Sequence, residues 1–409
     1  MLSPKLIFNK GITIWFLIIL WFVVSVILNS RSLLIGTLVV LLFYIIRENR
    51  SIINRLRIYY LGILFSVSII LLACFYKQDS SRGRVLIYKI SSGIFFDSGI
   101  YGIGIGNFKS TYLHYQQKYF QSEEKDYSEE ALLADNTYYL FNDYFQFVLE
   151  AGLLGLLIVI LFWTLIVRAF VSFYKLHKSL AEEICFIAVI PLVFAALFNH
   201  LFEKVAVQLI FCLTFPGIIY SEFGQRQKRK MLCLTAYLTF FLIFLFNNKN
   251  QLLLRNSYNQ LEEAQILASS GYSLESLDSL EHIKTSVRYT TAYQLTYGQL
   301  LYKIHRFKDA LPFLKNASAG LPSSDLYLLI GLCNKNLRAY DAAEYYLKSA
   351  IMMTPNRFSP RSELLSIYIL RNKHIEAKEV ALDILKLPVK IDSQKVHKIK
   401  SIAYKYLTS

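Results

Sequence analysis

Long apolar runs fill the first part of the chain and stop near Phe246. Each is close to the ~20 residues with which an α-helix crosses the hydrocarbon core of a bilayer, so the pattern predicts about seven transmembrane helices. These are Ile12–Leu28, Leu33–Ile46, Tyr59–Tyr76, Phe147–Phe170, Ile184–Phe198, Val205–Tyr220 and Met231–Phe246. The first run follows Lys5 and Lys10 and has no small-residue cleavage pattern, which favours a retained helix over a signal peptide.

Beyond Gln251 the apolar positions have the spacing of soluble helical hairpins, and small residues recur at a fixed interval. Two units align with an offset of 33 residues, and Ala377 continues the series: Gly298, Ala310, Ala317, Pro322; Gly331, Ala343, Ala350, Pro355. The recurrence resembles tetratricopeptide repeats (TPRs), helix-turn-helix units of ~34 residues that stack into a solenoid. Because such solenoids bind peptides or proteins, we expect a protein partner for this region.

The sequence therefore predicts an all-α protein, with a polytopic membrane domain followed by a soluble α-solenoid. The expected divisions are N-terminal transmembrane helices over 1–76, a long loop over 77–146, C-terminal transmembrane helices over 147–246 and the repeat domain over 252–409. Loops as long as the second division are usually functional or disordered, and its tyrosine-rich composition argues against disorder.

Membrane topology explains the net charge of +15 better than nucleic-acid binding does, because much of the excess positive charge lies in short connections between apolar runs. Arg31 and Lys204 are the basic residues in short connections on one side. The other side carries Lys5, Lys10, Arg47, Arg50, Arg55, Arg57, Arg168, Lys175, Lys178, Arg226, Lys228, Arg229 and Lys230. This bias predicts a cytoplasmic amino terminus, with the long loop and the repeat domain both outside the cytoplasmic membrane.

The five cysteines are scattered singly, which predicts neither a disulfide framework nor a metal site, and no cofactor is expected. Candidate chemistry begins instead where the loop enters the fourth apolar run. Asp143, Gln146 and Glu150 fall on one face of a helix, and Gly152 and Gly155 leave small surfaces where another helix can approach. The plainer alternative is an interfacial helix start with polar side chains that reach the head groups.

Three pieces of sequence around this helix carry a family resemblance. They are Gly83-Arg84 followed by Ile87-Tyr88, the run Gly102-Ile103-Gly104-Ile105-Gly106-Asn107-Phe108, and Asn142 followed by Gly152 and Gly155. In this order, in a loop before a membrane helix, they resemble the signature of the O-antigen ligase and polymerase superfamily. Those membrane enzymes move glycans from a polyprenyl-diphosphate carrier to lipid, glycan or protein acceptors.

The resemblance implies site residues of two kinds. A diphosphate leaving group needs cations, and a planar, always charged guanidinium suits it well, so Arg84 is the first candidate, followed by Arg82 and Lys109. The alternative is that both are juxtamembrane arginines that contact lipid head groups. Asn142 belongs to the signature itself and is counted with the catalytic candidates.

The general base is the point of departure from the family. Its members place a histidine directly before the residue that aligns with Asn142, and this chain has Phe141. Glu150 and Asp143 are then the first candidates to accept the acceptor's proton because they lie on the signature helix. The remaining candidates, His114 and His200, are isolated histidines, which more often have structural roles.

Two classes of function follow. The first is extracytoplasmic glycan transfer from a polyprenyl-diphosphate-linked donor. The second is a non-catalytic, membrane-anchored TPR scaffold, because the family usually has about a dozen spans and this chain has three before the loop, as expected of a short or truncated relative. A transporter is disfavoured, since the apolar runs contain few charges and show no internal duplication.

Overall fold

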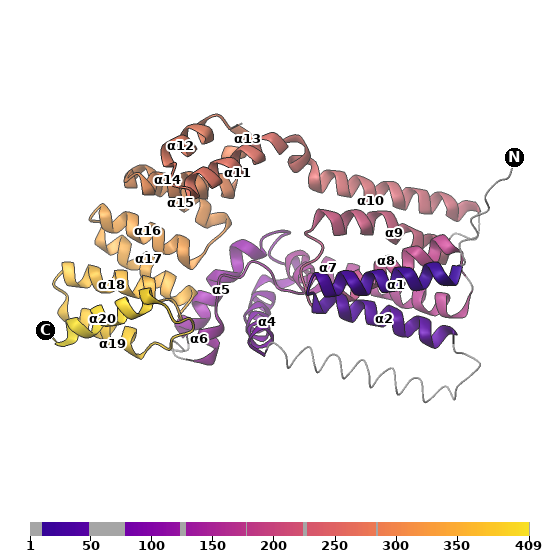
Figure 1. Cartoon of the computed structure of the whole chain (residues 1–409), viewed down its shortest axis with the longest axis horizontal. Coiled ribbons are helices and arrows are strands. Elements are labelled where there is room, and N and C mark those ends of the chain that lie inside the picture. The colour runs from indigo at the N-terminus through magenta and orange to yellow at the C-terminus, as the bar shows by residue number, and fades with distance from the viewer. Residues whose placement is uncertain are drawn as a thin grey trace. The chain divides into compact units, whose positions relative to one another are not determined.

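The computed structural model describes residues 10–48, 78–122, 128–176, 178–223, 227–283 and 285–408. Within these ranges every regular element is a helix, which confirms the all-α class (Figure 1). The contacts divide the chain into two compact units. The first contains the described residues within 1–81, 100–102 and 139–249, and the second contains those within 82–99, 103–138 and 250–409.

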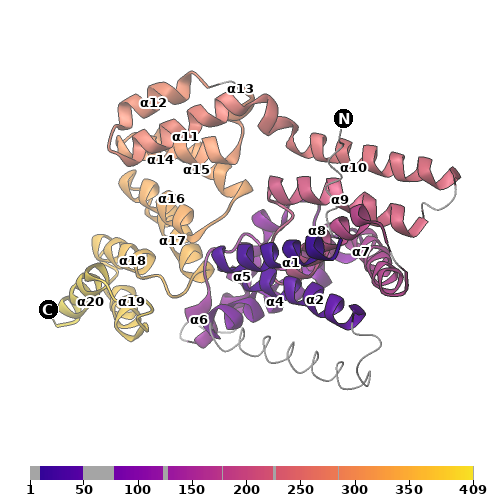
Figure 2. The same cartoon turned by 45° about the vertical axis from the view of Figure 1, so that its right-hand side comes forward.

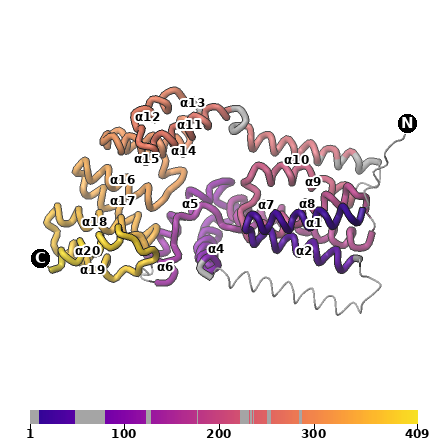
Figure 3. Tube along the Cα trace, viewed as in Figure 1, coloured from indigo at the N-terminus to yellow at the C-terminus, as the bar shows by residue number. Residues whose placement is uncertain are grey.

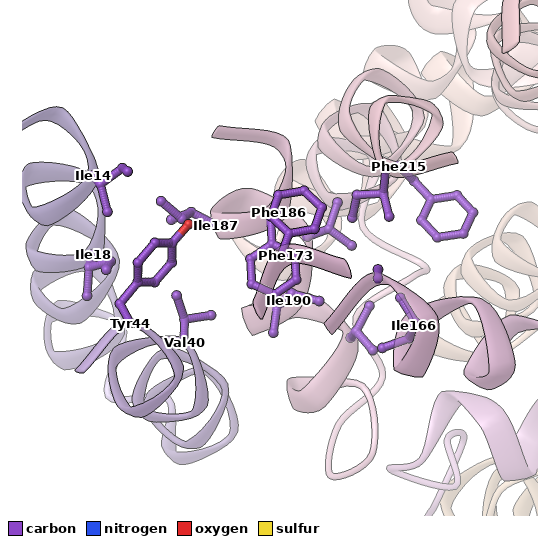
Figure 4. Close-up of a cluster of buried hydrophobic side chains, with 14 residues drawn as sticks. Ile14, Ile18, Val40, Tyr44, Ile166, Phe173, Phe186, Ile187, Ile190 and Phe215 are labelled. Atoms are coloured by element: carbon purple, nitrogen blue, oxygen red, sulfur yellow. The ribbon is translucent and has the colours of Figure 1, made fainter. Parts of the chain in front are cut away.

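The first unit is a helical bundle with an aromatic core. Its helices are α1 (Lys10–Ile27), α2 (Arg31–Glu48), α7 (Asp143–Lys175), α8 (Leu180–Ala195), α9 (Val205–Phe223) and most of α10 (Gln227–Leu253). Phe173 and Phe186 stack with their ring centroids 4.4 Å apart in the middle of the buried cluster (Figure 4). At Gly36 the backbone of α2 lies directly against Pro191 of α8, and an added Cβ would come within 2.3 Å of the Pro191 carbonyl oxygen.

Two helices of the described residues, α1 and α7, are long and apolar enough to cross a membrane, and Val205–Ser221 is a shorter apolar stretch. The other predicted spans differ for visible reasons. In α2 charged residues occupy both ends, and α8 has 16 residues and begins with an acidic turn. All of Tyr59–Tyr76 and several side chains of Met231–Phe246 lie outside the described residues. The arrangement of about seven spans therefore stays a prediction.

A group of charged side chains, the ionic cluster, joins three helices of the bundle. Glu183 of α8 is fully buried and accepts hydrogen bonds from Arg47 at 2.8 and 3.0 Å and from the Tyr44 hydroxyl, while Lys10 lies 3.5 Å away. Lys178 donates to the Ser221 carbonyl at 2.9 Å. The basic residues of this cluster belong to the side that the charge bias assigns to the cytoplasm.

The second unit combines the loop helices with the repeats. It contains α4 (Gln78–Ser98), α5 (Phe108–Ser122), α6 (Glu129–Leu133), α11 (Arg255–Ser269), α12 (Ser273–Glu281), α13 (Thr285–Arg288), α14 (Thr291–Lys303), α15 (Phe307–Gly320), α16 (Ser324–Asn336), α17 (Tyr340–Met353), α18 (Phe358–Leu370), α19 (His374–Lys386) and α20 (Gln394–Thr408). The short turn η1 (Gly99–Tyr101) lies where the chain passes between the units. Most of the predicted loop thus folds together with the repeat domain.

The repeat pattern is visible in the backbone as well as in the packing. His305, Arg338 and Asn372 end α14, α16 and α18 with positive φ angles of 61°, 60° and 55°. Gly298 faces Leu314, and Gly331 faces Leu347 one repeat later. A Cβ added at Gly298 would lie 2.8 Å from the Leu314 side chain, and one added at Gly331 would lie 2.9 Å from the Leu347 side chain. Small residues therefore lie where α14 packs on α15 and where α16 packs on α17, as the sequence spacing predicts. Figure 2 and Figure 3 show these helix pairs following one another in the repeat domain.

Candidate functional site

The N-terminal end of α7 is fixed by local backbone bonding. Asn142 is the N-cap, and its side-chain oxygen accepts a hydrogen bond from the Phe145 amide at 3.0 Å. Phe141, just before it, has a φ of 57°, a left-handed conformation that is uncommon for an aromatic residue. The signature asparagine thus satisfies an amide that a helix start leaves without an intrahelical partner.

A break in α7 brings two signature glycines together. Gly152 leaves helical geometry with φ 62° and ψ −140°, and the backbone of residues 100–102 crosses α7 at this position. An added Cβ at Gly152 would lie 2.1 Å from the Ile100 carbonyl oxygen, and one at Gly102 would lie 2.6 Å from the Glu150 carbonyl oxygen. The predicted close approach at Gly152 is present, and the partner is the backbone of a turn instead of a helix.

Gly155 serves the same break from within α7. Its added Cβ would lie 2.8 Å from the Phe147 carbonyl oxygen, which the altered backbone brings close to it. The nearest atoms to Gly155 belong to the preceding turn of α7, and the approach of a second helix there stays a prediction.

Gln146 and Glu150 form a polar chain at the start of α7. The Gln146 amide donates to Glu150 Oε1 at 3.1 Å, and its oxygen accepts from the Leu140 backbone amide at 3.1 Å. Glu150 is buried, with 6% of its surface exposed. These two residues share a face, as predicted.

Asp143 does not join this chain and instead holds the connection between α8 and α9. Its Oδ2 accepts hydrogen bonds from the Leu201 amide at 2.7 Å and the Phe202 amide at 3.2 Å, and its own amide donates to the Ala196 carbonyl at 3.0 Å. Because the carboxylate accepts from two backbone amides, it holds this connection against the start of α7.

The anchored connection carries His200. Its ring stacks on Tyr139 with the centroids 4.0 Å apart and an angle of 1° between the planes. The edge of Phe141 meets the same ring, with 5.4 Å between centroids and an angle of 73°. An imidazole therefore lies against Phe141, at the position where the resemblance implies a histidine, although the two residues are far apart in sequence.

The cationic candidates belong to the second unit. Arg84 lies on α4 one turn before Tyr88; burial raises the pKa of the Tyr88 hydroxyl, and the nearby Arg84 charge lowers it. Arg82 forms an exposed ion pair with Glu129, 3.4 Å from nitrogen to oxygen, and Lys109 is the second residue of α5. Surface ion pairs of this kind are weak, so Arg82 is easily redirected to an anion.

His114 lies on α5 against the repeats. Its ring meets Tyr327 of α16 edge-on with centroids 6.4 Å apart. Burial, and to a smaller degree the charge of Lys118, holds the pKa of His114 below its ordinary value. These surroundings indicate that His114 packs between helices of the second unit.

Among the described residues, no group of three or more His, Cys, Asp or Glu side chains is placed to hold a metal ion. The candidates divide between the units: Asn142, Asp143, Glu150 and His200 lie in the first, and Arg82, Arg84, Lys109 and His114 in the second.

A comparison with known families finds a match for the part of the chain that contains the signature. Residues 16–160 match the family model described as O-antigen ligase. Over this stretch, which is about a third of the chain, the sequence is similar to the O-antigen ligase family. The O-antigen ligase match includes Arg84 and both glycines of the backbone crossing, and it ends before His200.

The repeat region lies outside that match. Among solved structures, the chain is similar to one described as "MamA RS-1 ArsTM double mutant", with 18% identity, a TM-score of 0.31, and coverage of 39% of this chain and 91% of the other. No curated protein matches the chain.

The sequence did not predict two features of the first unit. The partners of Glu183 were not foreseen, although a carboxylate at the start of an apolar run is a signal that such a group is paired. The contact between His200 and Phe141 has no signature in sequence spacing, because the chain folds back between them.

Proposed function

We propose that the chain transfers a glycan from a polyprenyl-diphosphate-linked donor to a lipid, glycan or protein acceptor on the outer side of the bacterial cytoplasmic membrane. The observation that carries the proposal is the crossing of Gly102 and Gly152, where two separate pieces of the O-antigen ligase signature meet within the matched residues. Backbone contact this close tolerates no side chain, so both glycines serve one local geometry.

The proposed reaction assigns a charge-binding role to Arg84. The acceptor hydroxyl oxygen attacks the anomeric carbon, the bond from that carbon to the phosphate oxygen breaks, and polyprenyl diphosphate leaves with the bonding electrons. A guanidinium binds the two phosphates in a bidentate manner that an ammonium cannot reproduce. We expect Arg84→Ala and Arg84→Lys to abolish transfer while the protein level in the membrane stays normal; full activity in Arg84→Lys would contradict the bidentate role.

The hydroxyl proton must pass to a base, and we assign this role to His200. Its half-buried ring lies beside Phe141, the position of the family histidine, and Asp143 anchors the backbone that carries it. Glu150, first in the ranking from sequence, is more deeply buried at the helix break, where an acceptor hydroxyl reaches it less easily. Asp143 becomes a positioning residue.

The test is transfer by the purified full chain in liposomes, with a carrier-linked glycan from its own cell as donor. We expect His200→Gln to lower the rate by roughly 10²–10⁴-fold, the range for loss of a general base, and Glu150→Gln to lower it less. The reverse order would assign the base to Glu150. The double variant Phe141→His/His200→Gln, which restores the family position, should recover part of the lost rate.

The proposed function requires a particular orientation in the membrane. We place the loop and the repeat domain outside, as the charge bias predicts. Cysteines introduced at Lys118 and Lys315 should react with an impermeant maleimide in intact spheroplasts, whereas one at Lys175 should react only after permeabilisation. Protection at Lys118 or Lys315 would contradict the orientation.

A non-catalytic scaffold is the second candidate, and the presence of Phe141 in place of the family histidine favours it. The assay separates the two functions. If the unmutated chain transfers no glycan to lipid, glycan or protein acceptors, while its repeat domain still retains a protein from its own membrane, the scaffold becomes the better description.

A further inference from the structure

The loop helices of the second unit pack into the repeat domain. Helix α5 contacts α15 and α17, and the loop side chains Tyr112, Leu113 and Phe120 are at most 1% exposed. Gln116 is buried with them, and its amide donates to the carbonyl oxygens of Asp135 and Met353, the former at 3.2 Å. The repeats thus bind a segment of their own chain.

A turn between α17 and α18 holds the end of α6. The Asn356 amide donates to the carbonyl oxygens of Ala131, Leu132 and Ala134 at 3.0, 3.1 and 2.6 Å. The last carbonyls of a helix have no intrahelical partner, so this one side chain acts as a cap supplied from a distant part of the sequence.

Charged and polar pairs fix the residues that follow α6. Arg357 bridges Asp135 at 3.1 Å and Asp325 at 3.2 Å. Asn136 accepts from the Ser324 amide at 3.0 Å and donates to Asp325 at 2.8 Å. The segment 131–136 is therefore bound by the start of α16 and by the turn between α17 and α18, with side chains and backbone each contributing.

The turn that provides these groups is itself held rigidly. Arg361 is fully buried and donates to the carbonyl oxygens of Pro355 and Arg357, the latter at 3.3 Å, and it pairs with Asp383. Because these bonds fix the backbone on both sides of Asn356, its amide is directed at the three carbonyls in advance.

The same loop segment reaches the helix that carries Arg84. Lys89 of α4 donates to the Tyr119 hydroxyl of α5 at 2.7 Å and to Glu130 of α6 at 2.9 Å, and Tyr119 donates to Glu130 as well. Bonding is thus continuous from the repeats through α6 and α5 to α4.

We propose that Asn356 and Arg357 form an internal clamp that positions α4, and with it Arg84, to bind the donor diphosphate. The inference rests on the proposed glycan transfer and adds a role for the repeat domain: it orders the loop that binds the donor. Asn356 and Arg357 are positioning residues that act through the 131–136 segment.

Asn356→Asp is the sharpest test because it keeps the shape of the side chain and turns a donor toward three carbonyls into an anion. We expect amide hydrogen exchange in α5 and α6 of the purified full chain to accelerate about 10-fold or more, while α11 to α14 keep their protection. The kcat/KM for the donor should fall at least about 10-fold. The exposed Asn316→Asp, which makes the same chemical change on α15, should alter neither quantity.

A charge exchange provides the rescue. Arg357→Asp should weaken the clamp, and the double variant Arg357→Asp/Asp135→Arg should recover protection and transfer together. Unchanged exchange in Asn356→Asp would overturn the clamp, and faster exchange with unchanged transfer would overturn the positioning role. If the unmutated chain shows no transfer, the proposed function fails, whereas the exchange measurement still decides the clamp.

Discussion

Two buried carboxylates of the first unit, Glu183 and Glu150, have different surroundings. Glu183 is bound by Arg47 and Tyr44, with Lys10 nearby, so positive charge compensates it within the bundle. Glu150 accepts from the neutral amide of Gln146 beside a broken helix. The first arrangement joins three helices, and the second leaves polar groups next to a turn of the loop. A buried carboxylate therefore indicates function only after its partners are known.

The largest expected effect is the loss of stability when Glu183, the carboxylate paired with positive charge, is removed. Glu183→Ala leaves the Arg47 charge buried, with a side chain that is 12% exposed, and we expect a loss of about 3–5 kcal/mol in folding free energy. Thermal unfolding in detergent measures it. Glu182→Ala, which removes the capping-box partner of Ser179 in the same turn, is the control and should cost about 1 kcal/mol. Equal losses would show that the ionic cluster does not stabilise the bundle.

The helix break should respond next. Gly152→Ala forces a side chain into a left-handed conformation and toward the Ile100 carbonyl, so we expect a cost of at least about 1–3 kcal/mol and loss of transfer. Gly93→Ala is the matched change, because Gly93 lies inside α4 with open space around it and should gain about 0.5–1 kcal/mol. A stable, active Gly152→Ala would mean that the crossing adapts.

Asp143 tests the anchoring of His200. Asp143→Ala leaves the Leu201 and Phe202 amides without this acceptor, and we expect a loss of about 1–2 kcal/mol in stability, together with a fall of up to about 10²-fold in transfer. Asp143→Asn retains a side-chain oxygen and should be milder in both assays. A transfer rate that stays normal in Asp143→Ala would separate His200 from catalysis.

His114 is a reference histidine with the smallest expected effect. Its folded-state pKa is lowered, so the unfolded chain binds the proton more strongly, and protonation destabilises the fold as pH falls below the ordinary value of about 6.5. His114→Gln should remove that small dependence, seen in unfolding curves between pH 5 and 7, and leave transfer unchanged. A shift in the pH profile of transfer would assign His114 a role in the reaction.

The sequence predicted best where a local pattern determines the structure. Small residues at a constant spacing revealed the helix crossings at Gly298 and Gly331, and the Gln146–Glu150 pair followed from helix periodicity. The partner of Gly152 was predicted as a helix and is a turn, because spacing along one helix does not identify what approaches it. The place of His200 depends on a backbone anchor at Asp143, which no pattern of side-chain types discloses.

The cap on α6 also has a consequence in time. Ala131 precedes its partner Asn356 by 225 residues. At a synthesis rate of about 5–20 residues per second, roughly 10–45 s pass between the appearance of the two on the ribosome. During that interval the carbonyls of α6 lack the bonds of the finished fold. Each new chain therefore completes the cap on α6 only after Asn356 has been made, so a chain interrupted earlier lacks the clamp that we propose.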